Sequence, residues 1–154
     1  MARNERTAID VMFEAGRYGQ KNGKGFYKYE TDPKGKPKKV ADPETYKLLK
    51  QVQKDGDKSF SDEEIIERLM LPMIIEAARC LDDGIVGSPT EADMGLIMGL
   101  GFPPFRGGAL KYCDTLGMAH VIERCKQYAP LGKLYEPTES MQQMAAEGKT
   151  YYVK

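Results

Sequence analysis

A segment rich in glycine and proline, Gly99–Gly108, is the feature that most constrains the fold of this chain. It holds four glycines, two prolines and a single charged residue, Arg106. This composition cannot continue a helix, although apolar residues recur at helical spacing on both sides of it. Glycine permits a left-handed backbone and proline fixes φ, so the segment predicts a rigid corner between two helices. The residues that the corner holds in place are Phe102, Pro103, Pro104 and Phe105.

Helix start and stop signals recur along the rest of the chain. Ser61 with Glu64 three residues later predicts a capping box, and Ser88 followed by Pro89 predicts a second start. Further caps are expected at Asn4, Asp42 and Thr138. The signals predict helices at about residues 4–18, 44–53, 61–83, 88–99, 109–116, 118–128 and 138–147.

The helix that begins after Ser61 carries the clearest apolar pattern. We expect one wide buried stripe formed by Ile66, Leu69, Met70, Met73, Ile74, Ala77 and Leu81. Pro72 interrupts the helix and predicts a kink, a defect of about 3 kcal/mol that tertiary packing must offset.

Little of the sequence favours β-structure. The aromatic residues of Gly23–Tyr29 predict one short extended segment. The lysines that follow, at positions 34, 36, 38 and 39, lie among glycine and proline and predict a solvated loop. No aromatic residue separates these lysines to stack on a base, which argues against nucleic-acid binding. The predicted class is therefore all-α.

Composition excludes several further classes. Lysine plus arginine equals aspartate plus glutamate at 23 each, so no net charge favours a polyanion or an anionic membrane. No apolar run approaches the ~18 residues of a membrane span. The three cysteines, Cys80, Cys113 and Cys125, form no close pair, which is typical of a reducing compartment. We expect a cytoplasmic protein.

The sequence offers no catalytic, cofactor or metal site by itself. No complete G-x-G-x-x-G is present, and His120 is the only histidine. We interpret His120 as a solvated residue and the three cysteines as core residues. Taken alone, the residues indicate a helical packing or interaction module.

One internal similarity suggests a duplication. Gly23–Tyr27, which follows the first helix, resembles Gly148–Tyr152, which follows the last one. A duplicated unit explains this if the chain begins near the end of one copy and then contains a complete second copy.

The residues from Arg68 to Gly117 resemble the C-terminal helical domain of 3-hydroxyacyl-CoA dehydrogenases. The resemblance rests on Leu71-Pro72, Glu76-Ala77, Arg79-Cys80-Leu81, Gly84-Ile85, Ser88-Pro89, Glu91-Ala92-Asp93-Met94 and Gly101–Gly108. More closely, the residues resemble the C-terminal end of the α subunits of bacterial fatty-acid β-oxidation complexes, and Gly19–Tyr27 resembles the end of their first helical copy. The resemblance covers nearly the whole chain.

The resemblance implies a parent enzyme that uses NAD to oxidise 3-hydroxyacyl-CoA to 3-ketoacyl-CoA. Its histidine and glutamate pair belongs to a nucleotide-binding domain outside these residues. The family places an asparagine before an arginine near the start of the kinked helix, and Glu67 occupies that position here, beside Arg68. A carboxylate cannot donate the hydrogen bond of an amide, so this copy is expected to be catalytically degenerate.

We therefore expect an architectural, inactive piece of the parent, with a helical domain at residues 61–154, a linker and helix at 31–60, and the tail of the first repeat at 1–30. No cofactor is expected to bind this piece alone. The expected partners are the nucleotide-binding, first helical and hydratase domains of the parent subunit, with neither nucleic acid nor a membrane. The packing residues expected are Phe26, Tyr27, Phe102, Pro103, Pro104 and Phe105.

Two alternatives remain open at this point. The chain could bind acyl-CoA itself, with Lys24 or Arg106 on the phosphates. It could also dock the thiolase β subunit of the same complex.

Overall fold

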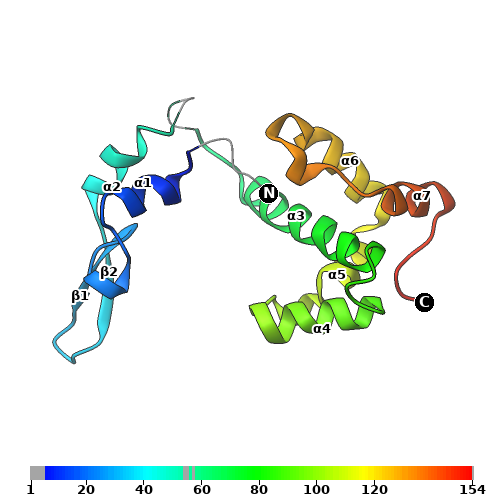
Figure 1. Cartoon of the computed structure of the whole chain (residues 1–154), viewed down its shortest axis with the longest axis horizontal. Helices are drawn as coiled ribbons and strands as arrows, with labels where there is room; N and C mark the ends of the chain where they lie inside the picture. Colours follow the sequence, from blue (N-terminus) through cyan, green and yellow to red (C-terminus); the bar gives the residue numbers. More distant parts are fainter. Residues whose placement is uncertain (1–5, 54–55, 57, 154) are drawn as a thin grey trace. The chain divides into compact units, whose positions relative to one another are not determined.

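The computed structural model describes residues 6–53, 56 and 58–153. The chain divides into two compact units, Met1–Ser59 (unit 1) and Phe60–Lys154 (unit 2) (Figure 1). Unit 1 contains α1 (Ala8–Glu14), the 3₁₀ helix η1 (Gln20–Asn22), β1 (Tyr27–Thr31), β2 (Pro37–Ala41) and α2 (Pro43–Leu49). Unit 2 contains α3 (Asp62–Asp82), α4 (Pro89–Leu100), η2 (Pro104–Arg106), α5 (Ala109–Leu116), α6 (Met118–Tyr128), η3 (Ala129–Leu131), η4 (Lys133–Tyr135) and α7 (Glu139–Glu147).

Helices dominate the described residues, which confirms the predicted all-α class with one small hairpin added. Among those residues, no helix combines the length and the apolar character needed to cross a bilayer. The assignment of residues 1–30 to an earlier repeat stays a prediction. β1 and β2 pair across the limit of that segment, so we describe unit 1 as one body.

The first helix begins later than the sequence suggested. The Thr7 side chain caps α1 and forms a capping box with Asp10, whereas Asn4 lies outside the described residues. The helix also ends earlier than expected, because the chain leaves it at Ala15 and Gly16 then takes a φ of 67°. The predicted helix was therefore too long at both ends.

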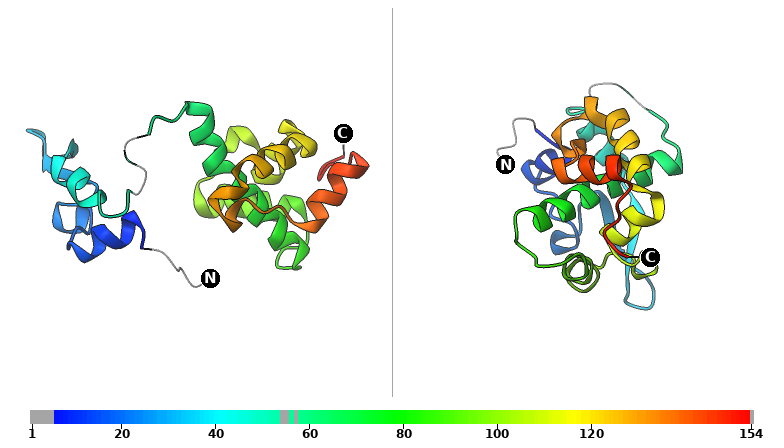
Figure 2. Two further views of the ribbon diagram at one scale, coloured as in Figure 1. Left: turned by 90° about the horizontal axis from the view of Figure 1, so that it is seen from above. Right: turned by 90° about the vertical axis from the view of Figure 1, so that its right-hand side faces the viewer.

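The lysine-rich stretch is only partly a loop. Lys38 and Lys39 lie on β2, which pairs antiparallel with β1 and places Glu30 opposite Lys38 and Tyr29 opposite Lys39. The turn before it is held by Asp32, whose Oδ1 accepts from the amides of Lys34 and Lys36. The hairpin extends from the two helices of unit 1 as an arm (Figure 2). The loop prediction was wrong for the second half of the stretch, because pairing with the neighbouring β1 outweighs the low strand preference of lysine, glycine and proline.

A buried ion pair holds unit 1 together. Arg17 Nη2 donates to Asp42 Oδ2 at 2.6 Å, and Arg17 Nε donates to the Gly25 carbonyl at 2.8 Å. Asp42 also caps α2 through the amide of Glu44, as the sequence predicted. The Arg17 hydrogen bond holds the pKa of Asp42 below its usual value. The end of α1, the loop before β1 and the start of α2 therefore meet at one carboxylate.

The helix starts predicted in unit 2 are confirmed. Ser61 accepts from the Glu64 amide, Ser88 from the Glu91 amide and Thr138 from the Met141 amide. α3 continues through Pro72 to Asp82 and contacts α4, α5 and α6. Figure 1 shows α3 between α4 on one side and α6 on the other.

The corner between α4 and α5 begins later in the sequence than predicted. α4 extends through Gly99 and Leu100, and only at Gly101, with φ of 71°, does the chain leave the helix. The expectation that the whole segment is non-helical was wrong for these two residues, because glycine is tolerated in the last turn of a helix. The corner directs its two aromatic residues differently: Phe102 is 2% exposed and Phe105 is 83% exposed.

Asp93 fixes the far side of this corner. It is buried on α4, and its two carboxylate oxygens accept from the amides of Leu110 and Lys111 at 2.8 and 2.9 Å, which caps the start of α5. The backbone of Gly108 passes so close that a Cβ there would lie 2.1 Å from Asp93 Cγ. The position therefore requires glycine both for space and for its φ of 109°.

The C-terminal segment forms hydrogen bonds with Asp93 of α4 and with Asp114 of α5. Tyr152 Oη donates to Asp93 Oδ2 at 2.7 Å, and the amides of Tyr151 and Tyr152 donate to the carboxylate of Asp114. Burial raises the pKa of Tyr152 to about 12, so this hydroxyl remains a donor across the neutral range. Three distant parts of unit 2 thus converge on Asp93 and Asp114.

The buried stripe predicted on α3 is confirmed in part: Ile74 and Ala77 are buried, and Met70, Met73 and Leu81 pack against the core of unit 2. Leu71, Ile74, Ile75 and Ala78 are buried, while Ile66 and Leu69 are exposed. The prediction was wrong for Ile66, which borders an open groove between α3, α5 and α6, and for Leu69, which is 65% exposed. Cys113 and Cys125 are fully buried in this core, as expected, and Cys80 is half-buried.

Two glycine substitutions test the corner. We expect Gly108→Ala to destabilise unit 2 by about 2–4 kcal/mol, because the methyl group overlaps Asp93 and alanine is strained at this φ. Gly95→Ala is the matched control: Gly95 lies inside α4, and a methyl group there would meet no atom within 4 Å, so helix propensity should raise stability by about 0.5–1 kcal/mol. Urea unfolding followed by circular dichroism measures both, and similar effects at the two sites would contradict the proposed role of Gly108.

Candidate functional site

Two of the hollows on the surface of unit 2 are lined by α3. The first, which we name the Arg106 groove, has a volume of about 310 Å³ and lies between α3, η2, α5 and α6. The second, the α3–α4 groove, has a volume of about 440 Å³ and is lined mainly by apolar residues of α3 and α4. The two differ in chemistry, so we describe them separately.

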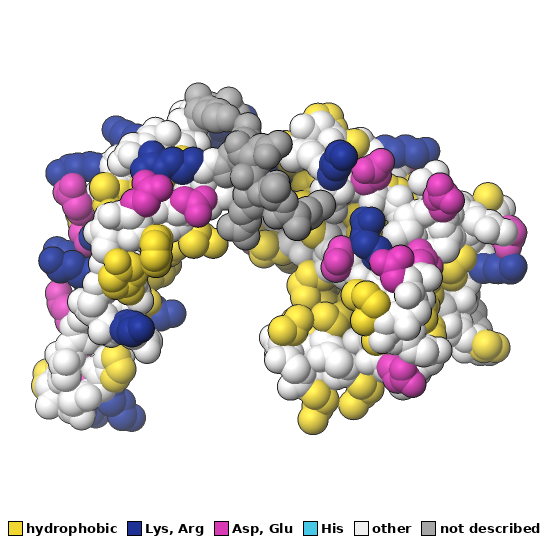
Figure 3. All heavy atoms as spheres, viewed as in Figure 1, with side chains coloured by type: hydrophobic (Ala, Val, Ile, Leu, Met, Phe, Trp, Pro, Cys, Tyr) yellow, Lys and Arg dark blue, Asp and Glu magenta, His cyan; other side chains and the backbone are white. Residues whose placement is uncertain are grey.

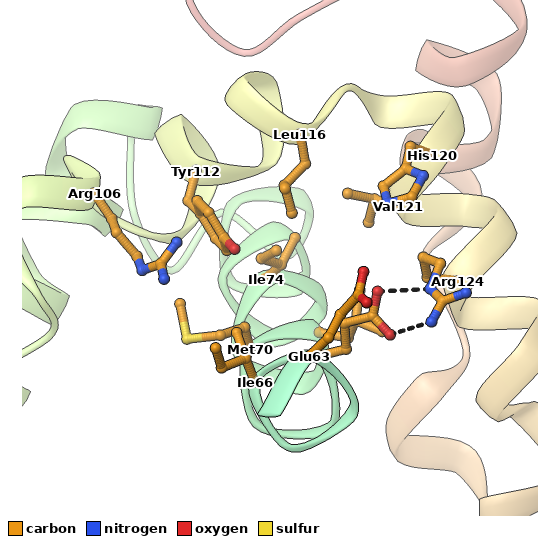
Figure 4. Close-up of a pocket in the computed structure, with 12 residues that line it drawn as sticks. Glu63, Ile66, Met70, Ile74, Arg106, Tyr112, Leu116, His120, Val121 and Arg124 are labelled. Atoms are coloured by element: carbon orange, nitrogen blue, oxygen red, sulfur yellow. Dashed lines mark hydrogen bonds and ion pairs between the residues drawn. The ribbon is translucent and has the colours of Figure 1, made fainter. Parts of the chain in front are cut away.

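The Arg106 groove has charged ends and an apolar middle. Arg106 and Tyr112 lie at one end, and Glu63, His120 and Arg124 lie at the other (Figure 4). Aliphatic side chains from three helices line the space between them: Ile66, Met70, Leu71, Ile74, Leu116 and Val121. The Arg106 guanidinium carbon lies 4.3 Å from the centre of the Tyr112 ring, which holds the cation by a cation–π contact.

Glu67 closes one end of this groove. Both of its carboxylate oxygens accept hydrogen bonds from Arg124 of α6; Arg124 Nε donates to Glu67 Oε1 at 2.6 Å, and Arg124 Nη2 donates to Glu67 Oε2. Tyr128 Oη donates a third hydrogen bond to Glu67 Oε2 at 2.6 Å. The Glu67 side chain is 14% exposed. The Arg124 hydrogen bond, followed by that of Tyr128, outweighs burial and holds the pKa of Glu67 below its usual value. Glu67 is therefore an ionised clamp between α3 and α6.

Of the two residues expected to bind substrate, one lines a groove. Arg106 lies at the mouth of the Arg106 groove, whereas Lys24 is an exposed residue of unit 1. The two lie in separate units, and a role for either in substrate binding stays a prediction.

The predicted packing residues also differ in their surroundings. Phe26 and Tyr27 of unit 1 are exposed, as are Pro104 and Phe105 of unit 2. Phe102 is buried in the core of unit 2, where it packs within its own domain and offers no surface to a partner. Pro103 is half-buried.

The remaining reactive side chains are the cysteines and His120. Burial raises the pKa of the Cys113 thiol to about 12 and that of Cys125 to about 11, so both thiols are protonated at neutral pH. His120 is exposed at the edge of the Arg106 groove. Across the described ranges, no three His, Cys, Asp or Glu side chains converge on a point where a metal ion could bind.

The α3–α4 groove is apolar, and further apolar side chains of α3, α4 and the corner are exposed. Pro72, Met73 and Cys80 of α3 face Leu96 and Leu100 of α4 across it. Around it, Met98 is 78% exposed and Leu100 is 75% exposed, and Leu69 and Phe105 are also largely exposed. Figure 3 shows hydrophobic side chains gathered over this part of unit 2. We name Leu69, Met94, Met98, Leu100 and Phe105 the bare apolar surface.

Known proteins match this chain over nearly its whole length. No family model matches it. It is 53% identical over 152 residues, 99% of its length, to the "Fatty acid oxidation complex subunit alpha" of Pseudomonas paraeruginosa and to that of Pseudomonas aeruginosa. The chain is similar to a fatty acid oxidation complex alpha subunit. This confirms the resemblance seen in the motifs.

The matching region is a small part of those relatives, since the chain spans 21% of their length. Among solved structures, the dehydrogenase part of multifunctional enzyme 1 from C. elegans matches with a TM-score of 0.64 at 24% identity, over 90% of this chain and 33% of that one. At this identity the likeness shows a shared fold.

Sequence reasoning missed Arg124, Tyr128 and Tyr112. Arg124 and Tyr128 lie four residues apart on α6, beside the buried Val121 and Cys125. Two polar groups next to an apolar helical face are a recognisable sign that their polar ends meet a partner. The identity of that partner, Glu67, depends on how α3 and α6 pack.

Replacement of the clamp residue tests its contribution. We expect Glu67→Gln to lower the free energy of unfolding at neutral pH by about 1–2 kcal/mol, a modest loss because Arg124 is 26% exposed. The control is Glu123→Gln, an exposed residue of the same helix as Arg124, with an expected change within about 0.5 kcal/mol.

The same variant should change the pH dependence of stability. Because the folded-state pKa of Glu67 is lowered, its contribution is complete above the usual glutamate pKa of 4.5 and is lost as the pH falls through the folded value. The stability difference between the wild type and Glu67→Gln should therefore shrink below pH 4.5 in urea titrations. A difference that stays constant down to the acid transition would contradict the clamp.

Proposed function

We propose that this chain is an architectural helical module of a fatty-acid-oxidising α subunit, and that it has no catalytic activity alone. The parent enzyme would oxidise 3-hydroxyacyl-CoA to 3-ketoacyl-CoA with NAD in the cytoplasm. The similarity to the Pseudomonas alpha subunits over 99% of the chain supports this assignment. The observation that carries the architectural role is the bare apolar surface of unit 2.

The two-sided apolar pattern of α3 supports a packing role. One face, with Leu71, Ile75 and Ala78, is buried in unit 2. On the other side of the helix, Met73 and Cys80 line the α3–α4 groove, and Leu69, one turn before Met73, is exposed. Apolar side chains on a second side of a helix normally pack against another surface, so a partner is expected there.

The exposed residues of α4 and the corner extend the same surface. Met94, Met98, Leu100 and Phe105 all point to solvent. Exposed apolar patches mark interaction sites on soluble proteins. The partner we propose is the remainder of the α subunit, with its first helical and nucleotide-binding domains, and the exposed aromatic residues Phe26 and Tyr27 of unit 1 would add contacts to it.

The state of Glu67 supports the absence of catalysis. A group that acts on a substrate must be free to reach it, whereas both oxygens of Glu67 are engaged by Arg124 and Tyr128. A carboxylate held in this way accepts hydrogen bonds and donates none. We infer that this position supports the helix packing and takes no part in oxidation.

Association with the rest of the subunit tests the packing role. The Pseudomonas aeruginosa alpha subunit without its matching region would be co-expressed with this chain and the complex isolated. We expect Met98→Lys with Leu100→Lys to weaken association at least about tenfold, because two charges would enter an apolar interface. Lysine near the end of α4 suits the helix dipole, so the variant should remain folded.

The matched control is Leu131→Lys, which places the same charge on an exposed leucine of η3 outside the bare apolar surface. We expect it to leave association unchanged. Equal loss in both variants, or no association of the wild-type chain, would overturn the packing role.

An activity assay tests the second part of the proposal. The isolated chain with NAD and a 3-hydroxyacyl-CoA should produce no NADH above the rate without protein. Turnover that scales with chain concentration would contradict the architectural assignment.

A further inference from the structure

The geometry points to a ligand site that this architectural role does not require: we propose that the Arg106 groove binds a small amphipathic carboxylate, with its carboxylate on Arg106 and its aliphatic chain along α3. The groove's volume of about 310 Å³ lies at the lower end of the range of small-molecule sites, about 300–1,000 Å³. The site is formed wholly within unit 2.

Arg106 supplies the recognition of the anion. In the part of the chain that the structure describes, its guanidinium contacts the rings of Tyr112 and Phe105, and no carboxylate forms an ion pair with it. Stacking on a ring occupies the face of a guanidinium and leaves the N–H groups at its edge free to donate to a carboxylate in two parallel hydrogen bonds. Arg106 ends the 3₁₀ turn Pro104–Arg106. Pro103 before this turn and the left-handed Gly107 after it fix the backbone and so set the direction of the Arg106 side chain.

The walls select an unbranched apolar chain. From Arg106 the groove continues past Met70 and Ile74 of α3 and Leu116 of α5 (Figure 4). Burial of each methylene group against such walls contributes about 0.8 kcal/mol at most. An aliphatic chain therefore gains affinity with length until it reaches the polar end.

The charged groups at the opposite end of the groove decide which ligand head groups can bind there. Glu63 and the neutral Glu67–Arg124 pair lie there beside His120. Because Arg124 is already engaged by Glu67, Arg106 is the cation of the groove that is left for a ligand anion. A second carboxylate at the far end would meet Glu63, so a monocarboxylate fits better than a dicarboxylate.

The test uses the full chain with methyl-labelled isoleucine, leucine and valine, titrated with decanoate below its micelle concentration. We expect saturable NMR shifts of the groove methyls, Ile74, Leu116 and Val121, without shifts of the exposed Ile85, Leu131 and Leu134, which lie outside the groove. Decanol and decanedioate should bind at least about fivefold more weakly than decanoate.

Variants of the cation complete the test. Arg106→Gln should weaken decanoate binding about tenfold and leave decanol binding unchanged, since only the charge-assisted contact is lost. The decanoate affinity of Arg106→Lys should fall between those of the wild type and Arg106→Gln, because lysine keeps the positive charge but lacks the two parallel N–H donors of the guanidinium. Arg79→Gln, which removes an exposed arginine of α3 outside the groove, should have no effect.

Three results would overturn the proposal: shifts spread equally over groove and distant methyls, equal affinity for decanoate and decanol, or unchanged binding in Arg106→Gln. Unaltered distant methyl signals in that variant show that it is folded. The packing role is measured separately through Met98 and Leu100, so failure of either proposal leaves the other standing.

Discussion

The buried carboxylate of Asp93 is the contact on which the arrangement of unit 2 depends. It joins α4, the first turn of α5 and Tyr152 near the C-terminus, and it leaves no room for a side chain at Gly108. A buried carboxylate is costly unless hydrogen bonds satisfy it, and here three donors do so. Because α5 is fixed in this way, the corner before it holds Phe102 in the core and turns Phe105 and Arg106 outward.

The outward side of this corner and the exposed side of α3 give unit 2 an apolar surface in addition to its core. Unit 2 has a complete core of its own, with fully buried Ile74, Leu110 and Val121, yet it leaves a second apolar surface bare. Stability of the unit alone does not require that surface. It fits a domain whose interior supports its fold and whose exterior supports a larger assembly, as expected for a region that spans 21% of its relatives.

The sequence could predict the local features that depend on near neighbours. The caps at Ser61, Ser88 and Thr138 follow from residues three positions apart, and the structure confirms each of them. The family resemblance was readable for the same reason, because its motifs lie in continuous segments. Likewise, the burial of Cys113 and Cys125 follows from their position on amphipathic helices.

What the sequence could not predict depends on contacts between distant residues. Which residues of α3 are buried is decided by the packing of the other helices, so Ile66 and Leu69 were assigned to the core although they are exposed. The clamp on Glu67 needs Arg124, which is 57 positions away. The strand at Lys38 and Lys39 was missed for another reason: its partner β1 is near in sequence, but lysine, glycine and proline disfavour a strand. The Arg106 groove draws on four elements and becomes visible only when they are assembled.

Hydroxyl-radical footprinting of Met94 and Met98 tests the central claim most directly. It would compare this chain alone with a Pseudomonas aeruginosa alpha subunit that carries these residues in place of its matching region. The account predicts strong oxidation of both methionines in the isolated chain and protection in the assembled subunit, with Leu131 equally reactive in both. Oxidation of Met98 at the same rate in the two samples would contradict a covered apolar surface and with it the architectural role.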